Sequence, residues 1–388
     1  MNNTEETILI LGAGTGGIAA AHELSKKFGK KHGSRPVKII LFEKEENNVF
    51  APSLLWLMVG KRKPKQIYRK TSKLAGHGIE LVTGNIEKID PANISVTTNG
   101  KTYQGSYMIV SLGVNQAPEC ELNLWGHDFY SLEGASNFHD AIRNFKGGKI
   151  AILVPSLPFK CPAAPYEAAM LVEAFIRKEK LREKTEISLY SPESGPLPVA
   201  GKQLSDGVRQ IMGMKGIQYH SDHQLMSATE RTLTFSNGST FEYDLLAYTP
   251  KHSCPSVISE TALIGKSGWI EVNGSTMETN FQNVYAIGDN TFIPLHVGKP
   301  LPKAGVFAHK QAITVAQNIS KKISGEKPDK TFNGEGQCFL ELGDGKAGYA
   351  GGNFYAFPAP EVKMKSPGFL WHWVKIWFEK YWFYKHFR

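Results

Sequence analysis

The chain has 388 residues, of which 41% are hydrophobic and 21% are charged, and its formal net charge is +9. This length exceeds the usual size of one domain, about 100–200 residues, so at least two domains are expected, and this composition excludes a largely disordered chain. The four cysteines are too few for a disulfide framework, and no two of them have the spacing of a zinc site, so no metal site is expected.

The two ends of the chain differ in charge and in apolar pattern. The start, MNNTEETILILGAG, has no basic stretch followed by an apolar region and a cleavage site, so we expect no cleaved signal peptide. Residues 361–388 contain six basic and two acidic residues, which concentrates the positive charge in the tail. Because the excess lies in one tail, the sequence does not indicate a partner nucleic acid.

A glycine-rich turn follows the first apolar segment, in TILILGAGTGGIAAAHELSKKF. A buried strand over 8–11 leads into Gly12, Gly14 and Gly17, which have the GxGxxG spacing, and a helix follows. The first glycine permits a tight turn, the second lets the backbone approach a pyrophosphate, and the third lets helix and strand pack closely. The next strand, VKIILFEK, carries Glu43, which is placed to accept hydrogen bonds from an adenosine ribose. This order of elements predicts a dinucleotide site.

The segment GGKIAILVPSLPFKCPAAPYEAA, residues 147–169, is like the start of a second nucleotide-binding unit. Its turn contains prolines, and no glycine follows the strand until Gly195. Because proline has no N–H, this turn cannot bind a pyrophosphate in the usual way, which disfavours a nicotinamide donor. The turn instead carries Cys161, beside Lys160 and before a predicted helix, where a thiol is expected to have a lowered pKa and to react as the thiolate. An isolated cysteine can also be an ordinary core residue.

The segment TNFQNVYAIGDN, residues 279–290, places a short strand directly before Gly288 and Asp289. The pattern TxxxxVYAxGD resembles the second FAD motif of flavoproteins with two dinucleotide-binding domains, the glutathione reductase-like group. The segment YMIVSLG, residues 107–113, is similar to another strand of that group, although its wording departs from the usual one. By this resemblance Asp289 holds the ribityl chain of FAD, while a helix cap is the structural alternative for this aspartate.

Two later segments contain further candidates. LPKAGVFAHKQA contains Lys303, and GEGQCFLELGDGKAGY contains Cys338 in a short alternating strand. The alternation places Cys338 on the same face as Leu340 and Leu342, directed inward. A solvated surface lysine and a buried strand thiol are the alternatives at these two positions.

The last segment, 367–388, is rich in aromatic residues. At helical spacing one face carries Leu370, Trp373, Val374, Trp377, Tyr381 and Tyr384, and the opposite face carries His372, Lys375, Glu379 and His386. The segment is too charged to span a bilayer, which takes about 20 mainly apolar residues. We expect an amphipathic helix at the membrane surface, with tryptophans at headgroup depth and lysines near anionic lipid. A helix at a dimer interface or packed on a domain is the alternative.

Together, FKCPAAPYE, VYAIGDN, LPKAGVFAHKQA and GQCFLELGDGKAGY resemble sulfide:quinone oxidoreductase and the flavoprotein subunit of flavocytochrome c sulfide dehydrogenase, over nearly the whole chain. The resemblance implies that Cys161 and Cys338 face the flavin as a disulfide or sulfur-bridged pair. It also implies that Lys303 lies at the pyrimidine end of the flavin, where positive charge stabilises the reduced form. Glu167 is a candidate proton relay one helical turn beyond Cys161, or else a capping or solvated glutamate.

The expected fold is therefore α/β, with two Rossmann-like dinucleotide-binding domains, glutathione reductase-like, and a C-terminal amphipathic membrane-docking segment. The predicted FAD-binding domain is discontinuous, over 1–115 and 268–325. The predicted second domain, which lacks an NAD phosphate turn, covers 116–267, and the C-terminal region with Cys338 and the membrane helix covers 326–388.

The expected activity is oxidation of sulfide to sulfane sulfur or polysulfide through the two cysteines and FAD, with reduction of a membrane quinone. The alternatives are a sulfide dehydrogenase flavoprotein that passes electrons to a cytochrome, and a non-catalytic flavin-binding membrane scaffold. The expected location is peripheral, or monotopic, on the cell membrane. A homo-oligomer stays open, and Cys120 and Cys254 are expected to be ordinary structural residues.

Overall fold

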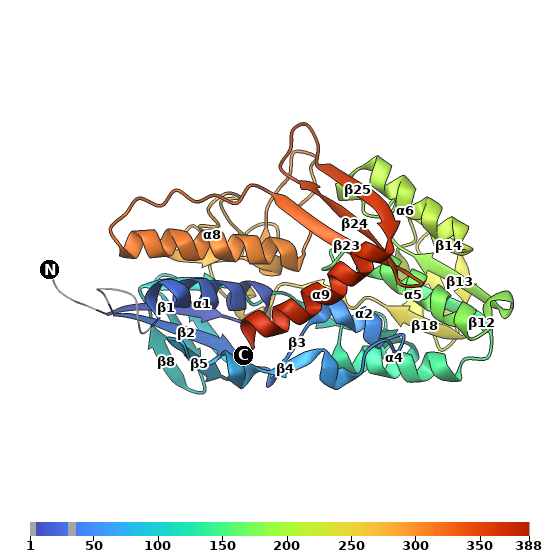
Figure 1. Cartoon of the computed structure of the whole chain (residues 1–388), viewed down its shortest axis with the longest axis horizontal. Coiled ribbons are helices and arrows are strands. Elements are labelled where there is room, and N and C mark those ends of the chain that lie inside the picture. Colours follow the sequence, from blue (N-terminus) through green and yellow to red (C-terminus); the bar gives the residue numbers. More distant parts are fainter. Residues whose placement is uncertain (1–4, 30–35, 388) are drawn as a thin grey trace.

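The structure is a computed structural model that describes residues 5–29 and 36–387. Residues 1–4, which form part of the N-terminal stretch examined for an export signal, and Arg388 of the basic tail lie outside the described residues. Two parallel sheets lie toward opposite ends of the molecule, and the last helix, α9 (Phe369–His386), runs from one toward the other (Figure 1). The prediction of an α/β fold with parallel sheets is confirmed.

The first parallel sheet has the strand order β21-β9-β1-β2-β5, so a late strand completes an N-terminal sheet. Residues 8–11 are fully buried, as expected for a strand covered on both faces. Helices α1 and α8 lie side by side over this sheet (Figure 1). The bounds are β1 Glu6–Leu11, α1 Thr15–Phe28, β2 Val37–Glu43, β5 Ile79–Thr83, β9 Tyr107–Val110, β21 Val284–Ala286 and α8 Gly305–Ile323.

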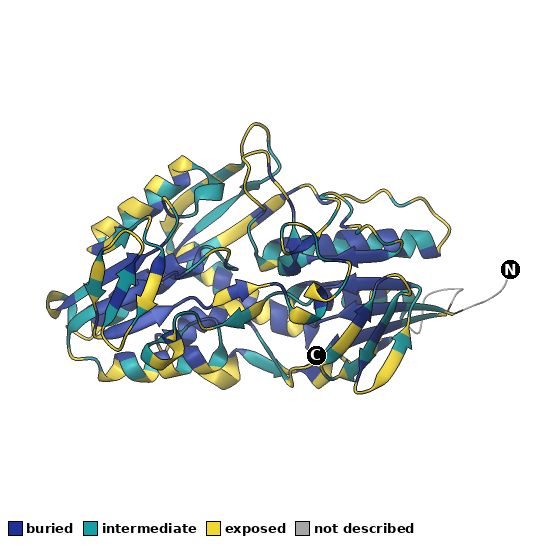
Figure 2. Ribbon diagram, turned by 180° about the vertical axis from the view of Figure 1, so that it is seen from behind, coloured by how far each residue is buried: buried dark blue, intermediate teal, exposed yellow. Residues whose placement is uncertain are grey.

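The second parallel sheet has the strand order β11-β18-β12-β13-β14. Strands in both parallel sheets are mainly buried, whereas exposed residues gather in loops and on the outer sides of helices (Figure 2). The bounds are β11 His127–Asp128, α4 Leu132–Asn144, β12 Gly148–Leu153, α5 Ala164–Lys178, β13 Thr185–Tyr190, α6 Lys202–Met214, β14 Ile217–His220 and β18 Leu245–Tyr248.

Smaller antiparallel sheets complete the fold: β3-β4, β6-β7-β8, β10-β19, β15-β16-β17 and β23-β24-β25, with β20 and β22 paired in parallel. The strands are β3 Asn47–Val49, β4 Tyr68–Lys70, β6 Ile86–Asp90, β7 Ser95–Thr98, β8 Lys101–Gln104, β10 Asn115–Ala117, β15 Leu225–Ala228, β16 Thr232–Phe235, β17 Thr240–Glu242, β19 Lys251–Ser253, β20 Ile270–Glu271, β22 Thr291–Phe292, β23 Glu335–Gly343, β24 Lys346–Asn353 and β25 Glu361–Gly368. The short helices are α2 Leu54–Leu57, α3 Leu122–Trp125 and α7 Ser256–Ser259.

Helix α9 turns its aromatic side outward and its charged side into the protein. Trp373 and Trp377 are 65% and 62% exposed, whereas Lys375 and Glu379 are 5% and 0% exposed. The expectation of a lysine near lipid is therefore wrong for Lys375, because this side chain is paired with a buried carboxylate of α5. In the described part of the chain, no helix combines the length and the apolar character needed to cross a bilayer.

Candidate active site

The glycine turn between β1 and α1 has the geometry that a pyrophosphate site needs. Gly12 has φ of +96°, and a Cβ there would lie 2.6 Å from the Ser111 carbonyl oxygen. A Cβ at Gly17 would lie 1.8 Å from the Gly12 carbonyl oxygen, so helix and strand approach too closely for any side chain. A Cβ at Gly14 would meet nothing within 4 Å, which leaves open space over the turn. A side chain at each of the three positions would therefore interfere for a different reason: strain at Gly12, loss of open space at Gly14 and a clash at Gly17.

Glu43, at the end of β2, holds the glycine turn in place. One carboxylate oxygen accepts a hydrogen bond from the Ala13 N–H at 2.8 Å, and the other accepts from the Lys44 and Glu45 N–H groups at 2.8 and 3.0 Å. The carboxylate thus lies beside the turn, at the carboxyl edge of the first sheet, where the ribose of a dinucleotide is bound in such folds.

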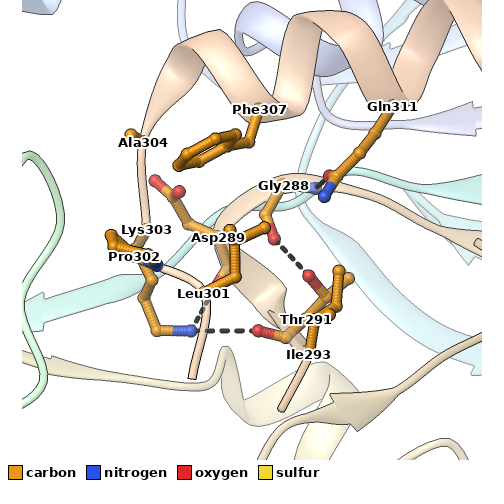
Figure 3. Close-up of a pocket in the computed structure, with 10 residues that line it drawn as sticks. All are labelled: Gly288, Asp289, Thr291, Ile293, Leu301, Pro302, Lys303, Ala304, Phe307 and Gln311. Carbon is orange, nitrogen blue, oxygen red and sulfur yellow. Dashed lines mark hydrogen bonds between the residues drawn. The ribbon is translucent and has the colours of Figure 1, made fainter. Parts of the chain in front are cut away.

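Asp289 follows β21 and has an unpaired polar atom. Its Oδ1 is buried and finds no hydrogen-bond partner among the described residues, and in Figure 3 the carboxylate points away from the Lys303 amine, toward the side of Phe307. Burial raises the pKa of this carboxyl, against the lowering effect of Lys160 and Lys303. Neighbouring Gly288 donates its N–H to Gln311 Oε1 at 2.8 Å, which fixes the turn to α8.

Lys303 precedes α8 and is held by backbone carbonyls. Its Nζ donates to the Asp289 oxygen at 2.6 Å and to the Thr291 oxygen at 3.2 Å, and it lies 3.3 Å from the centre of the Trp269 ring (Figure 3 shows the two hydrogen bonds). Burial lowers the pKa of Lys303 to about 8. The cation is therefore positioned beside Asp289 rather than solvated.

Cys161 lies in the proline-rich turn between β12 and α5, in a left-handed conformation with φ of +51°. Its N–H donates to the Lys303 carbonyl at 2.7 Å, which ties this turn to the segment before α8. Burial, followed by the charge of Glu167, raises the pKa of the thiol to about 12. The expectation of a lowered pKa is wrong, because loss of hydration outweighs Lys160.

Cys338 lies on β23, which packs along α5 with its chain running in the same direction. A Cβ at Gly343 would touch Ala174 and Met170, and the Glu341 N–H donates to Glu167 Oε1 at 2.7 Å. Going back along β23 from Gly343 through Glu341, Cys338 lies beyond the first residue of α5, on the side of Cys161.

Leu340 and Leu342 are buried as expected, but the inward placement of Cys338 is wrong, because β23 has passed beyond α5 there and the residue is exposed. The surrounding protein raises the pKa of the Cys338 thiol, and the charge of Cys161 is the next cause. The two cysteines, both free thiols, therefore share one electrostatic environment.

A buried charged cluster joins α5, β23 and α9 next to these thiols. Glu167 Oε1 accepts from Lys375 Nζ at 2.6 Å, and Glu341 Oε1 lies 2.9 Å from His372 Nδ1. Burial raises the pKa of Glu167, and Lys375 opposes this effect. Charges on Glu167 and Glu341 raise the pKa of Lys375 despite its burial. The sequence placed Lys375 on the polar side of the tail but gave no sign that it reaches Glu167.

At the carboxyl ends of β13 and β14, aromatic rings occupy the region where a second dinucleotide would bind. Tyr190 stacks on His220 with ring centres 4.4 Å apart and on Phe235 at 4.8 Å. In parallel α/β sheets nucleotides bind outside this edge. The stack joins three separate strands, so no local sequence pattern predicts it.

The remaining cysteines lie apart from the thiol pair. Cys161, Leu340 and Leu342 belong to one hydrophobic cluster, whereas Cys120 packs in a cluster with Leu246, and Cys254 packs in a third. Cys120 Sγ contacts the Met226 carbonyl at 3.5 Å.

Comparisons with known proteins agree with this geometry. Residues 139–250 match the family model described as the central part of the sulfide dehydrogenase (flavocytochrome c) flavoprotein chain. The chain is 24% identical over 355 residues to the mitochondrial sulfide:quinone oxidoreductase of Mus musculus, covering 87% of this chain and 75% of that one. It is 24% identical to the sulfide-quinone reductase of Aquifex aeolicus, covering 97% and 90% of the two chains. In sequence the chain is therefore similar to the sulfide:quinone oxidoreductase and flavocytochrome c sulfide dehydrogenase flavoprotein family.

The fold agrees with this family. The crystal structure of the Aquifex aeolicus sulfide:quinone oxidoreductase has a TM-score of 0.86 and 22% identity, and the similarity covers 98% of this chain and 91% of that chain. The family model that matches residues 139–250 describes a flavoprotein chain.

The described residues fit FAD. The open space over Gly14 leaves room for a pyrophosphate, and the unpaired Oδ1 of Asp289 is a buried acceptor that a ribityl hydroxyl would satisfy. Both lie near the N-termini of α1 and α8, since a Cβ at Gly305 would lie 3.4 Å from Thr15 Oγ1. Paired helix N-termini favour an anion.

Proposed function

We propose that this protein oxidises sulfide at Cys161 and Cys338 and passes the electrons through FAD to a membrane quinone. Two observations support the proposal: the turn after β12 carries Cys161 where phosphate-binding glycines are missing, and the charge of Cys161 is among the causes that raise the pKa of the Cys338 thiol on β23. The names of the relatives, sulfide:quinone oxidoreductase and sulfide-quinone reductase, support the same substrates.

In the proposed cycle the two cysteines begin as a disulfide or sulfur-bridged pair. Hydrosulfide forms a bond to one cysteine sulfur while the bond between the cysteine sulfurs breaks, which leaves a persulfide on one residue and a thiolate on the other. The thiolate then bonds to the persulfide sulfur, which releases two electrons and one proton. When bound, FAD accepts these electrons and delivers them to the quinone.

The side chains around the cysteines have distinct proposed roles. Glu167, buried and with a raised pKa, takes up the proton that the persulfide releases. Lys303 supplies positive charge beside Asp289, where it would stabilise a reduced, anionic cofactor. Glu43 and the three glycines, Gly12, Gly14 and Gly17, hold the adenosine and pyrophosphate end.

A nicotinamide donor is disfavoured by the second domain. The turn after β12 has prolines in place of glycines, and the stack of Tyr190, His220 and Phe235 fills the edge of the sheet that a second dinucleotide would use. Electrons must therefore enter by another route, and the thiols provide one.

The exposed side of α9 supports a peripheral location on a membrane, where quinone is found. The residues are Phe369, Leu370, Trp373, Trp377, Phe378, Tyr381 and Tyr384, each at least 38% exposed. A contiguous aromatic face of this kind fits the interface of a bilayer, with tryptophan and tyrosine at headgroup depth. We call these seven residues the aromatic stripe.

Anaerobic titration of the purified holoenzyme with sulfide tests the proposal. We expect rapid loss of the flavin absorbance near its visible maximum, and no loss in Cys161→Ser or Cys338→Ser. Cys254→Ser, in a separate hydrophobic cluster, is the matched control and should still bleach. Bleaching by NADH but not by sulfide would overturn the proposal.

The electron acceptor is tested separately. The sulfide-reduced enzyme should be reoxidised by decylubiquinone and not by cytochrome c. Preference for cytochrome c would favour the alternative, a sulfide dehydrogenase flavoprotein. A protein that binds FAD but reacts with neither donor would be a non-catalytic scaffold.

A further inference from the structure

Residues 60–73, GKRKPKQIYRKTSK, contain seven basic residues and no acidic residue. We call these residues the basic segment. It connects α2 to β4 and the short 3-10 helix after it. The basic segment lies beside α9, so its charge is next to the helix that carries the aromatic stripe.

Two arginines attach the basic segment to α9. Arg62 pairs with the buried Glu379 at 3.0 Å and lies 4.4 Å from the centre of the Trp56 ring. Arg69 lies 3.9 Å from the centre of the Phe383 ring. Both arginines therefore act as structural contacts, and they fix the stretch between them against the side of the helix.

Lys63 and Lys65 lie in the short turn between these arginines and are exposed. No ion pair is found for either lysine among the described residues. The nearest exposed acids in sequence, Glu45 and Glu46, lie within ion-pair distance of Lys44 and Lys70. The charge of Lys63 and Lys65 is therefore available to a partner.

Two of the three lysines of α9 lie against carboxylates. Lys375 is buried against Glu167, and Lys380 lies 3.4 Å from Glu379. The aromatic stripe includes Phe378. Its ring centre lies 5.6 Å from that of Phe50, which precedes the basic segment in the chain. An apolar stripe bordered by unpaired lysines matches a bilayer with negatively charged headgroups.

We propose that Lys63 and Lys65 form a second membrane contact, which selects anionic lipid while the aromatic stripe inserts. The inference rests on the proposed docking of α9 and adds the lipid class. Each lysine near an anionic surface contributes about 1 kcal/mol, which is about fivefold in affinity. The attraction falls with ionic strength, because salt screens exposed charges.

The test is sedimentation of the full-length holoenzyme with two kinds of vesicle, pure phosphatidylcholine and phosphatidylcholine mixed with phosphatidylglycerol. Wild type should bind the anionic vesicles more tightly, and this advantage should shrink as salt is raised. The double variant Lys63→Gln/Lys65→Gln should lose about tenfold or more of affinity for anionic vesicles and keep its affinity for neutral ones.

Lys88→Gln/Lys266→Gln is the matched control. Both lysines are exposed, and their elements pack on the other face of the first sheet from Trp382 and Phe383 of α9. This variant should bind like wild type. An equal loss in both double variants would overturn the inference, and so would salt-resistant binding that ignores phosphatidylglycerol.

Two further outcomes distinguish a failure of the lipid inference from a failure of the proposed docking of α9. If wild type binds neither vesicle, the docking of α9 itself is wrong. If it binds duplex DNA through Lys63 and Lys65 and shows no lipid preference, the basic segment serves nucleic acid and the lipid inference is wrong.

Discussion

Gly14 and Gly17 are separated by two residues, yet the structure predicts opposite consequences of adding one methyl group. Gly17→Ala places a Cβ 1.8 Å from the Gly12 carbonyl oxygen, whereas Gly14→Ala meets no atom within 4 Å. We expect Gly17→Ala to lose about 3 kcal/mol or more of unfolding free energy, because backbone must move to admit the methyl group. Gly14→Ala should fold normally, to within about 1 kcal/mol, and bind FAD more weakly.

Denaturant unfolding of the apoproteins and the ratio of flavin to protein absorbance in the holoproteins measure these two effects separately. A Gly14→Ala variant with full FAD affinity would contradict the assignment of the open space to the pyrophosphate. Equal stability of the two variants would contradict the close contact at Gly17.

The raised pKa of Cys161 has a direct chemical consequence for the reduced protein. With a pKa of about 12, this thiol is almost entirely protonated at neutral pH. Alkylation by iodoacetamide should therefore be at least about a hundredfold slower than for a free cysteine near pH 8, and should accelerate as the pH rises toward 12. Mass spectrometry of the Cys161 peptide measures the rate, and fast, pH-independent alkylation would show that the thiolate is stabilised after all.

Lys375 is predicted to act as a positioning residue for Glu167. Lys375→Met leaves a buried carboxylate without its partner at 2.6 Å and should cost about 3–5 kcal/mol of stability. The pKa of Glu167 is already raised by burial, so the folded variant favours the protonated carboxyl. A folded-state pKa above the unfolded value means that stability is greatest at acidic pH and falls as the pH rises past about 4.5.

Urea unfolding of Lys375→Met at acidic and at neutral pH measures this slope. Adding Glu167→Gln to Lys375→Met should remove most of the pH dependence, since no buried carboxylate then remains at this position. If the two variants show the same pH dependence, Glu167 is not the group that titrates.

At the scale of elements, α9 has two faces of different character. Its buried face carries Lys375 and Glu379, and its outer face carries the aromatic stripe. We expect Trp373→Ala/Trp377→Ala to bind vesicles at least about tenfold more weakly, because each exposed tryptophan provides a large apolar surface for the interface. The reaction with sulfide should be unchanged, since neither side chain reaches the thiols.

Stopped-flow bleaching by sulfide and reduction of quinone in vesicles distinguish these effects. The variant should bleach normally and reduce vesicle-bound quinone slowly. Loss of bleaching as well would mean that the aromatic stripe supports the fold rather than the membrane contact.

At the scale of the whole molecule, the sequence predicted the elements that local patterns encode. The GxGxxG turn, the strand before Asp289, the helix after Cys161 and the amphipathic tail all have short sequence signals, and the structure contains them. Resemblance to a family placed Cys161 and Cys338 together. No local signal joins positions so far apart in the chain.

What the sequence could not predict depends on burial and on contacts between distant elements. The pKa of Cys161 was predicted in the wrong direction, because a helix N-terminus and Lys160 can be read from the sequence but loss of hydration cannot. The predicted inward placement of Cys338 was wrong, because the sequence does not show where α5 begins relative to β23 in the folded protein. The pairing of Arg62 with Glu379 joins residues 317 positions apart and has no sequence pattern.

The ion pair between Arg62 and Glu379 holds α9 against the body of the protein. If α9 moved away from the body, Arg62 would lose its ion pair with the fully buried Glu379. Lys375 and Glu167 would also lose their ion pair with each other. Under the proposed docking, leaving a bilayer would therefore require the whole protein to move away with α9 still packed against it.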